Sequence, residues 1–367
     1  MRLKFKETIP FFVLDNEIQI GEEEGVAGFL EDPDGSVKLL VENLDGSKDI
    51  EEIIHLVQKQ YPNISDEEIT NALEVLANEG YLENASLEPK LLTSYELERY
   101  KANINYFSLF TSYKENKFAI QEKINQTPIS LLGVGGLGTQ ILYHLSALGF
   151  HNIKALDFDH IELSNFNRQL LYSEKDIGKN KIEMAKKRIA EFNPNVNLET
   201  TNKKIESTQD VINHIEGTEL VICVADKPTL HLLNWVNEAV VTCNVPLVSG
   251  GILNTRGRFF SMVPKETGCI QCHIDYARKI NQKQNDQFEA MRNIDYQRKN
   301  AAISPNVAIL AGTLVNEAIK ILTGMGESLS IGKVMEINFM NLEKKLVSRW
   351  EKLEECPVCG DKTFTYA

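Results

Sequence analysis

The sequence feature that most constrains the fold is a glycine-rich stretch over residues 129–138. It begins as an apolar run from Ile129 to Leu132, and a helical pattern starts at Thr139. Between them stand the glycines Gly133, Gly135, Gly136 and Gly138. This order is typical of a buried parallel strand, a tight glycine turn and a helix whose N-terminal amides bind phosphate. The stretch therefore predicts a nucleotide site.

An acidic residue, Asp157, ends the next apolar run along the chain. An acid about 20 residues beyond a glycine loop fits a ribose hydroxyl of a bound nucleotide. The pattern occurs in dehydrogenases that bind a nicotinamide cofactor as well as in enzymes that use ATP. The glycine loop and Asp157 thus leave the choice between these two nucleotides open.

The main part of the chain alternates expected strands and helices. Strands are expected over 129–134, 153–157, 197–205, 219–224 and 245–249, with helices over 137–148, 179–192 and 228–241. An antiparallel stretch over 258–263, a charged region over 276–300, a helix over 306–323 and two strands within 333–350 should follow. The alternation predicts an α/β fold with a doubly wound, Rossmann-like, mostly parallel sheet that binds its ligand at the carboxyl ends of the strands.

Residues 1–92 predict a smaller, separate domain. Short alternating runs indicate an antiparallel sheet, and two helices follow, the first capped by Ser47 and the second by a capping box at Ser65. We interpret this unit as a winged-helix-like domain that recognises a peptide, because its helices are acidic. A purely structural cap and DNA binding are the alternatives. A mostly helical connecting segment is expected over 93–128, before a main domain over 129–367.

Charge and hydropathy exclude several classes of function. The formal net charge is −13 and no face of clustered Lys and Arg is apparent, which argues against nucleic-acid binding. No apolar run approaches the roughly 20 residues that span a membrane. The first six residues also lack the apolar core and cleavage site of a secretion signal. We therefore expect a cytoplasmic protein that binds neither nucleic acid nor a membrane.

Four of the six cysteines form two Cys-x-x-Cys pairs. The pairs are Cys269 with Cys272 and Cys356 with Cys359. In a chain without a secretion signal, this spacing predicts a tetrahedral four-thiolate zinc site, which is structural because the protein fills every position. A redox pair is the alternative. Cys223 and Cys243 lie in or beside apolar runs, so we expect them to be packed rather than reactive.

An ordered set of motifs chooses between the nucleotides. The motifs are Asp157-x-Asp159, Ser164-Asn165-x-x-Arg168-Gln169, Gly178-x-x-Lys181 and, after a later strand, Val224-Ala225-Asp226. Behind a glycine loop, this set resembles the adenylating superfamily that includes ThiF, MoeB and the ubiquitin-activating enzymes. The resemblance implies a nucleotidyltransferase that uses ATP. A dehydrogenase gives no reason for Arg168, Lys181 and Asp226 together.

The resemblance also implies roles for the residues of the set. Arg168 and Lys181 would neutralise the phosphates, Asn165 would orient them, Asp157 would hold the ribose, Asp226 would hold magnesium, and Gln169 would contact the nucleotide. Fixed positive charge is needed because a carboxylate about 4 Å from a phosphate is repelled by roughly 4 kcal/mol at an effective dielectric near 20. Taken singly, these residues could be surface cations, with Asp226 a helix cap.

The same two cysteine pairs occur in ThiF, MoeB and related enzymes, which supports the zinc prediction. Members of the superfamily that form a thioester or persulfide carry a further cysteine in the loop after the first pair. Residues 277–306 contain none. A thioester relay by that route is therefore not expected.

A closer resemblance is to the MccB-like branch, the enzymes that mature microcin C-type peptides. It rests on residues 225–237, 264–269 and 304–308 and on the position of the small N-terminal domain. It implies adenylation of the C-terminal carboxylate of a short ribosomal precursor peptide, which the N-terminal domain would help to bind. Phosphoramidate formation would follow where the last residue of the substrate allows it. The reaction would belong to the maturation of a peptide antibiotic.

The resemblance further implies a homodimer, with one departure. Family members carry Arg-Tyr-x-Arg before the glycine strand, and the second arginine reaches the ATP site of the partner. This chain has Arg99-Tyr100-Lys101-Ala102, so alanine replaces that arginine. The contribution of a cation across the dimer is thus not implied by the sequence.

Two other functions stay open. A sulfur-carrier or ubiquitin-like protein could supply the carboxylate, as for MoeB, although those simpler enzymes lack the N-terminal domain. A non-catalytic partner that only recruits a peptide would instead carry a damaged nucleotide site.

Overall fold

The computed structural model describes residues 1–25, 27–229, 231–280, 283, 286, 290 and 301–360. The chain divides into two compact units, Met1–Lys123 and Ile124–Ala367, and each unit is described by itself. Most of the charged region expected over 276–300 lies outside the described residues. The division of the chain into segments 1–92, 93–128 and 129–367 stays a prediction.

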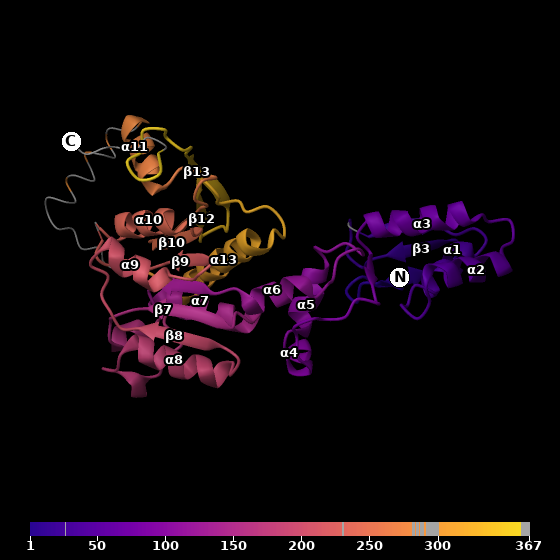
Figure 1. Cartoon of the computed structure of the whole chain (residues 1–367), viewed down its shortest axis with the longest axis horizontal. Helices are drawn as coiled ribbons and strands as arrows, with labels where there is room; N and C mark the ends of the chain where they lie inside the picture. Colours follow the sequence, from indigo (N-terminus) through magenta and orange to yellow (C-terminus); the bar gives the residue numbers. More distant parts are fainter. Residues whose placement is uncertain are drawn as a thin grey trace. The chain divides into compact units, whose positions relative to one another are not determined.

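The second unit contains an eight-stranded sheet (Figure 1). Its strands are β6 (Ile129–Leu132), β7 (Asn152–Leu156), β8 (Asn197–Thr201), β9 (Leu220–Cys223), β10 (Leu247–Leu253), β11 (Arg256–Met262), β12 (Lys333–Asn338) and β13 (Lys344–Arg349). Strands β8-β7-β6-β9-β10 are parallel neighbours in that order, and β11, β12 and β13 extend the sheet by antiparallel pairing. The predicted α/β fold with a mostly parallel sheet is confirmed.

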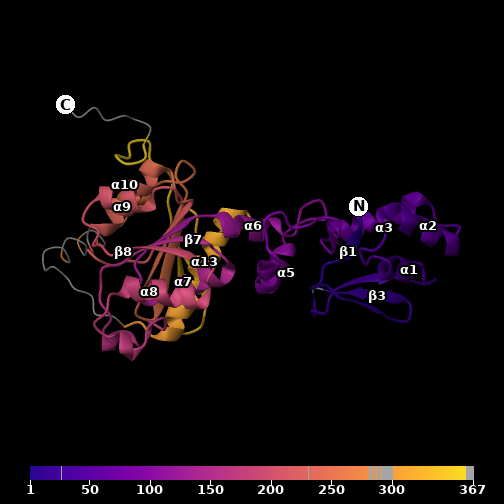
Figure 2. The ribbon, with the colours of Figure 1, turned by 60° about the horizontal axis from the view of Figure 1, so that its bottom comes forward.

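Helices cover the sheet in two groups. They are α7 (Gly136–Leu148), α8 (Lys181–Phe192), α9 (Thr208–Ile215), α10 (Leu232–Cys243), α11 (Ile270–Ile280) and α13 (Ser304–Thr323). α7 packs against α8 and α13, whereas α10 packs against α9 and α11. Figure 2 shows the strands between the two groups. Every residue of β6 and of β9 is buried, as expected for central parallel strands.

The strand order reverses direction at β6. The chain moves outward from β6 to β7 and β8, then returns to β9 on the other side of β6. The carboxyl ends of β6 and β9 therefore form a switch point of strand order, and open α/β sheets bind their ligands in a crevice at such a point. The glycine stretch follows β6, and the segment with Asp226 follows β9.

One described helix, α13, is long and apolar enough to cross a membrane by length and composition alone. This corrects the expectation that no apolar run approaches that length. The helix packs against α7, β10 and β11, and Leu310, Leu314 and Ala318 are fully buried. This packing is that of a core helix in the folded unit.

Helices α9 and α11 were not expected from the sequence. α9 spans eight residues with three buried side chains, Val211, His214 and Ile215, so its apolar stripe is short. α11 begins between the first two zinc-type cysteines and continues into the expected charged region. Expected strands also ended too late, because β6 stops before Gly133, whose φ of 95° is incompatible with a strand.

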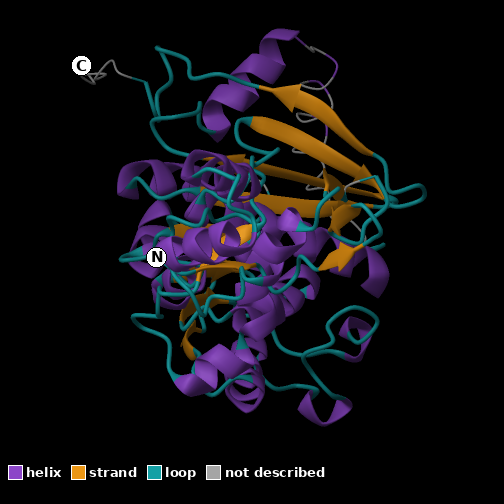
Figure 3. Cartoon of the chain, turned by 90° about the vertical axis from the view of Figure 1, so that its right-hand side faces the viewer, coloured by secondary structure: helices purple, strands orange, loops and turns teal. Residues whose placement is uncertain are grey.

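The first unit holds two small sheets and six helices among its described residues (Figure 3). β1 (Leu3–Phe5) pairs with β5 (Leu82–Asn84), and β2 (Phe11–Val13), β3 (Glu17–Ile20) and β4 (Gly28–Glu31) form an antiparallel sheet. The helices are α1 (Ser36–Glu42), α2 (Ile50–Gln60), α3 (Asp66–Asn78), α4 (Ser94–Arg99), α5 (Lys101–Ser108) and α6 (Ala119–Gln126), the last of which runs into the second unit. The expected antiparallel sheet is present, α1 was not expected, and the winged-helix assignment stays a prediction.

The caps of α2 and α3 test two sequence expectations. Ser65 caps α3 through a capping box with Glu68, as expected. α2, however, is capped by Asp49, whose side chain accepts from Glu52 N at 2.9 Å, and Ser47 is not its cap. The helix starts two residues later than Ser47 would require. An aspartate and a serine so close together both satisfy the capping preference, so sequence alone could not separate them.

We expect Asp49→Ala to destabilise α2 by about 1 kcal/mol, because its first-turn amides lose their acceptor. Hydrogen exchange of the amides of residues 50–60 measures this locally. Ser47→Ala is the matched control and should leave that exchange unchanged. Equal acceleration in both variants would contradict the assigned cap.

Candidate functional site

The loops after β6 and β9 touch at Gly133. A Cβ atom built at Gly133 would lie 2.7 Å from the backbone nitrogen of Ala225, and one at Gly138 would lie 2.0 Å from Gly133 O. Neither position has room for a side chain. Glycine is therefore required at Gly133 both by its positive φ and by the approach of the loop that carries Asp226.

Asp157 accepts a hydrogen bond from the backbone of the glycine loop. Its Oδ2 accepts a hydrogen bond from Val134 N at 2.6 Å, and its Oδ1 accepts one from Asp159 N at 2.8 Å. Tyr172 donates its hydroxyl to Val134 O at 3.2 Å, so both backbone groups of Val134 are bound. Burial raises the pKa of Asp157, while the two backbone hydrogen bonds and the charge of Lys181 oppose that rise. The expected contact between Asp157 and a ribose stays a prediction.

Lys181 lies buried at the start of α8 and forms an ion pair with Asp159, which is not among the predicted site residues. Its Nζ is 3.0 Å from Oδ2 of Asp159. Its charge also acts on Asp157, which places Lys181 beside the glycine loop. The Asp157-x-Asp159 spacing is the signal that could have identified Asp159.

Arg168 lies against the glycine loop on its exposed side. A Cβ atom built at Gly136 would meet its Cδ and Cγ at 3.3 Å. Its Nη1 donates to Ser164 O at 3.1 Å and to Asn167 Oδ1 at 2.7 Å. Burial lowers the pKa of Arg168, and the nearby exposed Asp226 raises it. Asp226 is thus close enough for its charge to act on Arg168.

Gln169 supplies a buried acceptor that fits a ligand. The side chain is 2% exposed, and its Oε1 has no hydrogen-bond partner among the described residues. Its Nε2 lies 4.0 Å from the Cβ position at Gly135. Buried acceptors are normally paired, so this oxygen and the glycine cradle suit a nucleotide that can donate to it. Asn165 is buried too, but its Oδ1 already accepts from Glu162 N at 3.1 Å.

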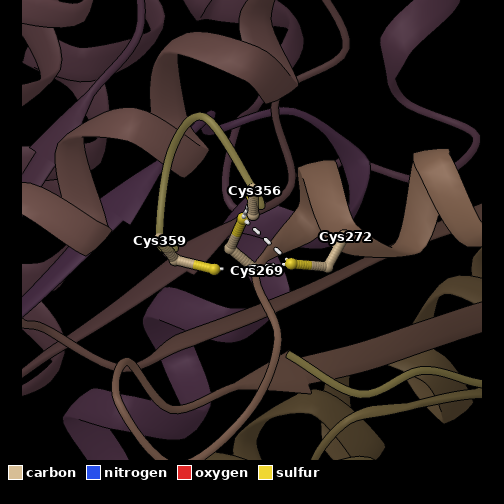
Figure 4. A group of neighbouring side chains, drawn as sticks. All are labelled: Cys269, Cys272, Cys356 and Cys359. Carbon is tan, nitrogen blue, oxygen red and sulfur yellow. Dashed lines mark hydrogen bonds between the residues drawn. The ribbon is translucent and has the colours of Figure 1, made fainter. Parts of the chain in front are cut away.

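The four paired cysteines gather in one cluster, as predicted (Figure 4). Their Sγ atoms all lie within 4.8 Å of one another. The separations are 4.0 Å for Cys269–Cys272, 3.6 Å for Cys269–Cys356 and 3.4 Å for Cys272–Cys359. Thiolates around a tetrahedral zinc lie about 3.8 Å apart, given Zn–S bonds of about 2.3 Å. The donor set and its geometry fit zinc.

The surroundings of the cluster orient its sulfurs. Leu353 N lies 3.4 Å from Cys272 Sγ, and Asn237 Nδ2 lies 3.5 Å from Cys269 Sγ. Burial raises the pKa of Cys269 to about 11, so a bound divalent cation would be needed to keep it a thiolate at neutral pH. Such donors to sulfur are typical of the outer shell of a metal site.

The remaining cysteines are not part of the cluster. Cys223 is buried in β9, and burial raises its pKa to about 12, which makes it unreactive as a nucleophile. Cys243 is partly buried at the end of α10. Both positions agree with packed rather than reactive thiols.

We expect purified protein to contain one zinc ion per chain by elemental mass spectrometry. Cys356→Ser should lower both the zinc content and the thermal midpoint, because a tetrahedral site loses one of its thiolates. Cys243→Ser is the matched control and should change neither. A zinc-free native protein whose thiol titration shows two disulfides would instead support the redox alternative.

We expect Gly133→Ala to weaken ATP binding at least tenfold, because the methyl group forces the two loops apart. Calorimetric titration with a non-hydrolysable ATP analogue measures the affinity, and circular dichroism checks that the fold persists. Gly312→Ala in α13 is the control, since no atom lies within 4 Å of its Cβ position. Wild-type affinity in the folded Gly133→Ala protein would refute the role of this contact.

This chain resembles known proteins in its sequence and in its fold. Residues 100–358 match the sequence model of the ThiF family. The molybdopterin-synthase adenylyltransferase of Salmonella typhimurium is 26% identical over 244 residues, which cover 66% of this chain and 91% of that protein. The sulfur carrier protein adenylyltransferase of Thermus thermophilus is 27% identical over 252 residues, which cover 66% of this chain and 85% of that protein.

A solved structure resembles the chain over nearly its whole length. The crystal structure of Escherichia coli MccB with AMPCPP and MccA has a TM-score of 0.78 and 22% identity, and covers 98% of this chain and 100% of that chain. At this identity the likeness concerns the fold. The curated relatives and the residues around the glycine loop together support an adenylyltransferase. Because the family match spans well over half of the sequence, this chain belongs to the ThiF family.

Proposed function

We propose that this chain uses ATP and magnesium to adenylate the C-terminal carboxylate of a ribosomally made peptide. The observation that carries the proposal is the fold of the whole chain. The Salmonella and Thermus relatives each match 66% of it, whereas the MccB structure matches 98% and therefore includes the first unit. About a third of this chain therefore lies outside its match to each of those two relatives. We assign the first unit to recognition of the peptide.

The crevice beside the glycine loop suits the chemistry of adenylation. One oxygen of the peptide carboxylate attacks the α-phosphorus of ATP, and the bond from that phosphorus to the bridging oxygen of the β-phosphate breaks. The products are an acyl adenylate and pyrophosphate, and no proton needs to be removed from the attacking carboxylate. Catalysis by this chain is therefore positioning and charge neutralisation, without a protein nucleophile.

Two cations, Arg168 and Lys181, lie near the glycine loop, where the phosphates of ATP would bind. Arg168 lies on the exposed side of the loop, and Lys181 lies buried beside Asp157. Lys181 is paired with Asp159 at 3.0 Å, and a phosphate that enters would compete for it. Asp226 would hold magnesium, which supplies positive charge on the pyrophosphate oxygens. The sequence offers no thioester cysteine over 277–306, so the acyl adenylate would be released or captured directly.

The fate of the acyl adenylate depends on the substrate. We propose that a nitrogen of the last residue can then attack the phosphorus of the acyl adenylate: the N–P bond forms, the P–O bond to the carboxylate breaks, and the N–H proton is released as the free carboxylate leaves. The two adducts have the same mass, and hydroxylamine separates them, because it converts the acyl adenylate to a peptide hydroxamate and AMP and leaves the phosphoramidate intact.

A second function follows from the names of the relatives. Two of them are named for sulfur carriers or molybdopterin synthase, so a small protein could supply the carboxylate here too. The nucleotide site would work in the same way. The two functions differ in the first unit, which would then have no peptide to bind.

We expect magnesium-dependent exchange of labelled pyrophosphate into ATP when short peptides with free C-termini are added. Asp226→Ala should reduce the exchange at least a hundredfold. Glu219→Ala, an exposed acid at the amino end of the same strand region, is the matched control and should retain it. Exchange that requires a small protein ending in Gly-Gly, and never a peptide, would favour the sulfur-carrier function.

A further inference from the structure

Three cations surround one buried carboxylate at the outer part of the eight-stranded sheet. Glu336 on β12 is 1% exposed and accepts from Arg258 Nε at 2.8 Å and from Arg256 Nη1 at 3.1 Å. Lys345 Nζ lies 3.3 Å from the same carboxylate. We call Arg256, Arg258 and Lys345 the cation cluster. Among the described residues no other carboxylate pairs with it, so three positive charges and one negative charge leave a net charge of +2.

The cation cluster lies on one open face of the sheet. Arg258 is opposite Glu336, which in turn is opposite Lys345, and the three belong to neighbouring strands. Gly251 on β10 continues this row, and a Cβ atom built there meets nothing within 4 Å. Gly257, on the other face, packs against α13. The cations are 44–53% exposed, so they reach solvent while Glu336 does not.

The row lies at the same edge of the sheet as the nucleotide site. Cys223, the last residue of β9, pairs with Ser249, and Gly251 stands two residues further along β10. The segment with Asp226 leaves β9 at this level. Because neighbouring strands are about 4.8 Å apart, β11 lies about 10 Å from β9 and about 14 Å from β6. Between them lies Gly251, whose Cβ position has no atom of the described residues within 4 Å.

Glu336 organises the cation cluster without neutralising it. Burial alone would raise the pKa of Glu336, but hydrogen bonds from Arg258 and Lys345 and the charges of both arginines lower it, so the carboxylate stays ionised. Arg258 uses its Nε for this bond. Among the described residues no acceptor is hydrogen-bonded to its two terminal nitrogens, and a carboxylate fits that pair of donors in a bidentate manner.

We propose that the cation cluster binds an acidic side chain of the peptide substrate. This deepens the proposed function and rests on it. The occupant is anionic because the cluster carries excess positive charge in a chain whose net charge is −13. An extended peptide advances about 3.4 Å per residue, so a span of about 10–14 Å corresponds to three or four residues. The bound Asp or Glu therefore lies about three or four residues before the C-terminal residue, whose carboxylate is adenylated.

The test uses synthetic heptapeptides with free C-termini, randomised at every position. Full-length protein, ATP and magnesium activate them, hydroxylamine traps each acyl adenylate as a hydroxamate, and mass spectrometry sequences the trapped peptides. We expect at least fivefold enrichment of Asp and Glu at the fourth or fifth position from the C-terminus. Arg258→Gln and Lys345→Gln should abolish that enrichment. Lys344→Gln, whose neighbour in β12 is Ile337 on the other face, is the matched control and should keep it.

Stability is controlled separately from recognition. The double variant Arg258→Gln/Lys345→Gln leaves Glu336 paired with Arg256, so the buried carboxylate keeps a cation while the excess positive charge is removed. For one enriched peptide and its Asp→Asn analogue, the wild type should differ about tenfold in KM with kcat within twofold. In the folded double variant this difference should vanish.

The outcomes separate the two proposals. Trapped peptides without an acidic preference, or a preference that survives Arg258→Gln and Lys345→Gln, would overturn the role of the cation cluster and leave peptide adenylation standing. No trapped peptide and no pyrophosphate exchange with any peptide in the wild type would overturn the proposed function, and this inference with it.

Discussion

The close approach of two backbone loops, at Gly133 and Ala225, is the constraint on which the rest of the site depends. The parallel pairing of β6 with β9 sets the glycine turn next to the segment that leads to Asp226, at the point where the strand order reverses. The charged groups of the site lie around this contact. Arg168 packs along Gly136, and Lys181 is held near Asp157.

The sequence predicted what local patterns encode. The glycine turn, the alternation of strands and helices around it and the cysteine spacing each depend on nearby residues, and Ser65 caps its helix as expected. The sequence could not reveal the ion pair between Asp159 and Lys181. That pair forms only when the segment after β7 packs against the start of α8. The cation cluster was equally hidden. Arg256 and Glu336 lie 80 residues apart, and only the register of β11 on β12 brings them together.

The cysteine cluster connects the start of α11 with the segment that follows β13. Its first pair precedes or begins α11, and its second pair follows β13, the outermost strand of the sheet. Trp350, between β13 and the second pair, donates its indole N–H to Gly268 O at 2.8 Å, beside the first pair. A zinc ion here would restrain the strand that carries Lys345. Zinc binding and the proposed peptide surface are thus connected through β13.

The two hydrogen bonds at Val134 have a thermodynamic consequence for nucleotide binding. Asp157 and Tyr172 fix both backbone groups of this residue, so the turn is already ordered by side chains of the protein itself. The conformational entropy of the turn is lost when the chain folds, and not when a ligand arrives. A nucleotide therefore does not have to order the phosphate cradle when it binds.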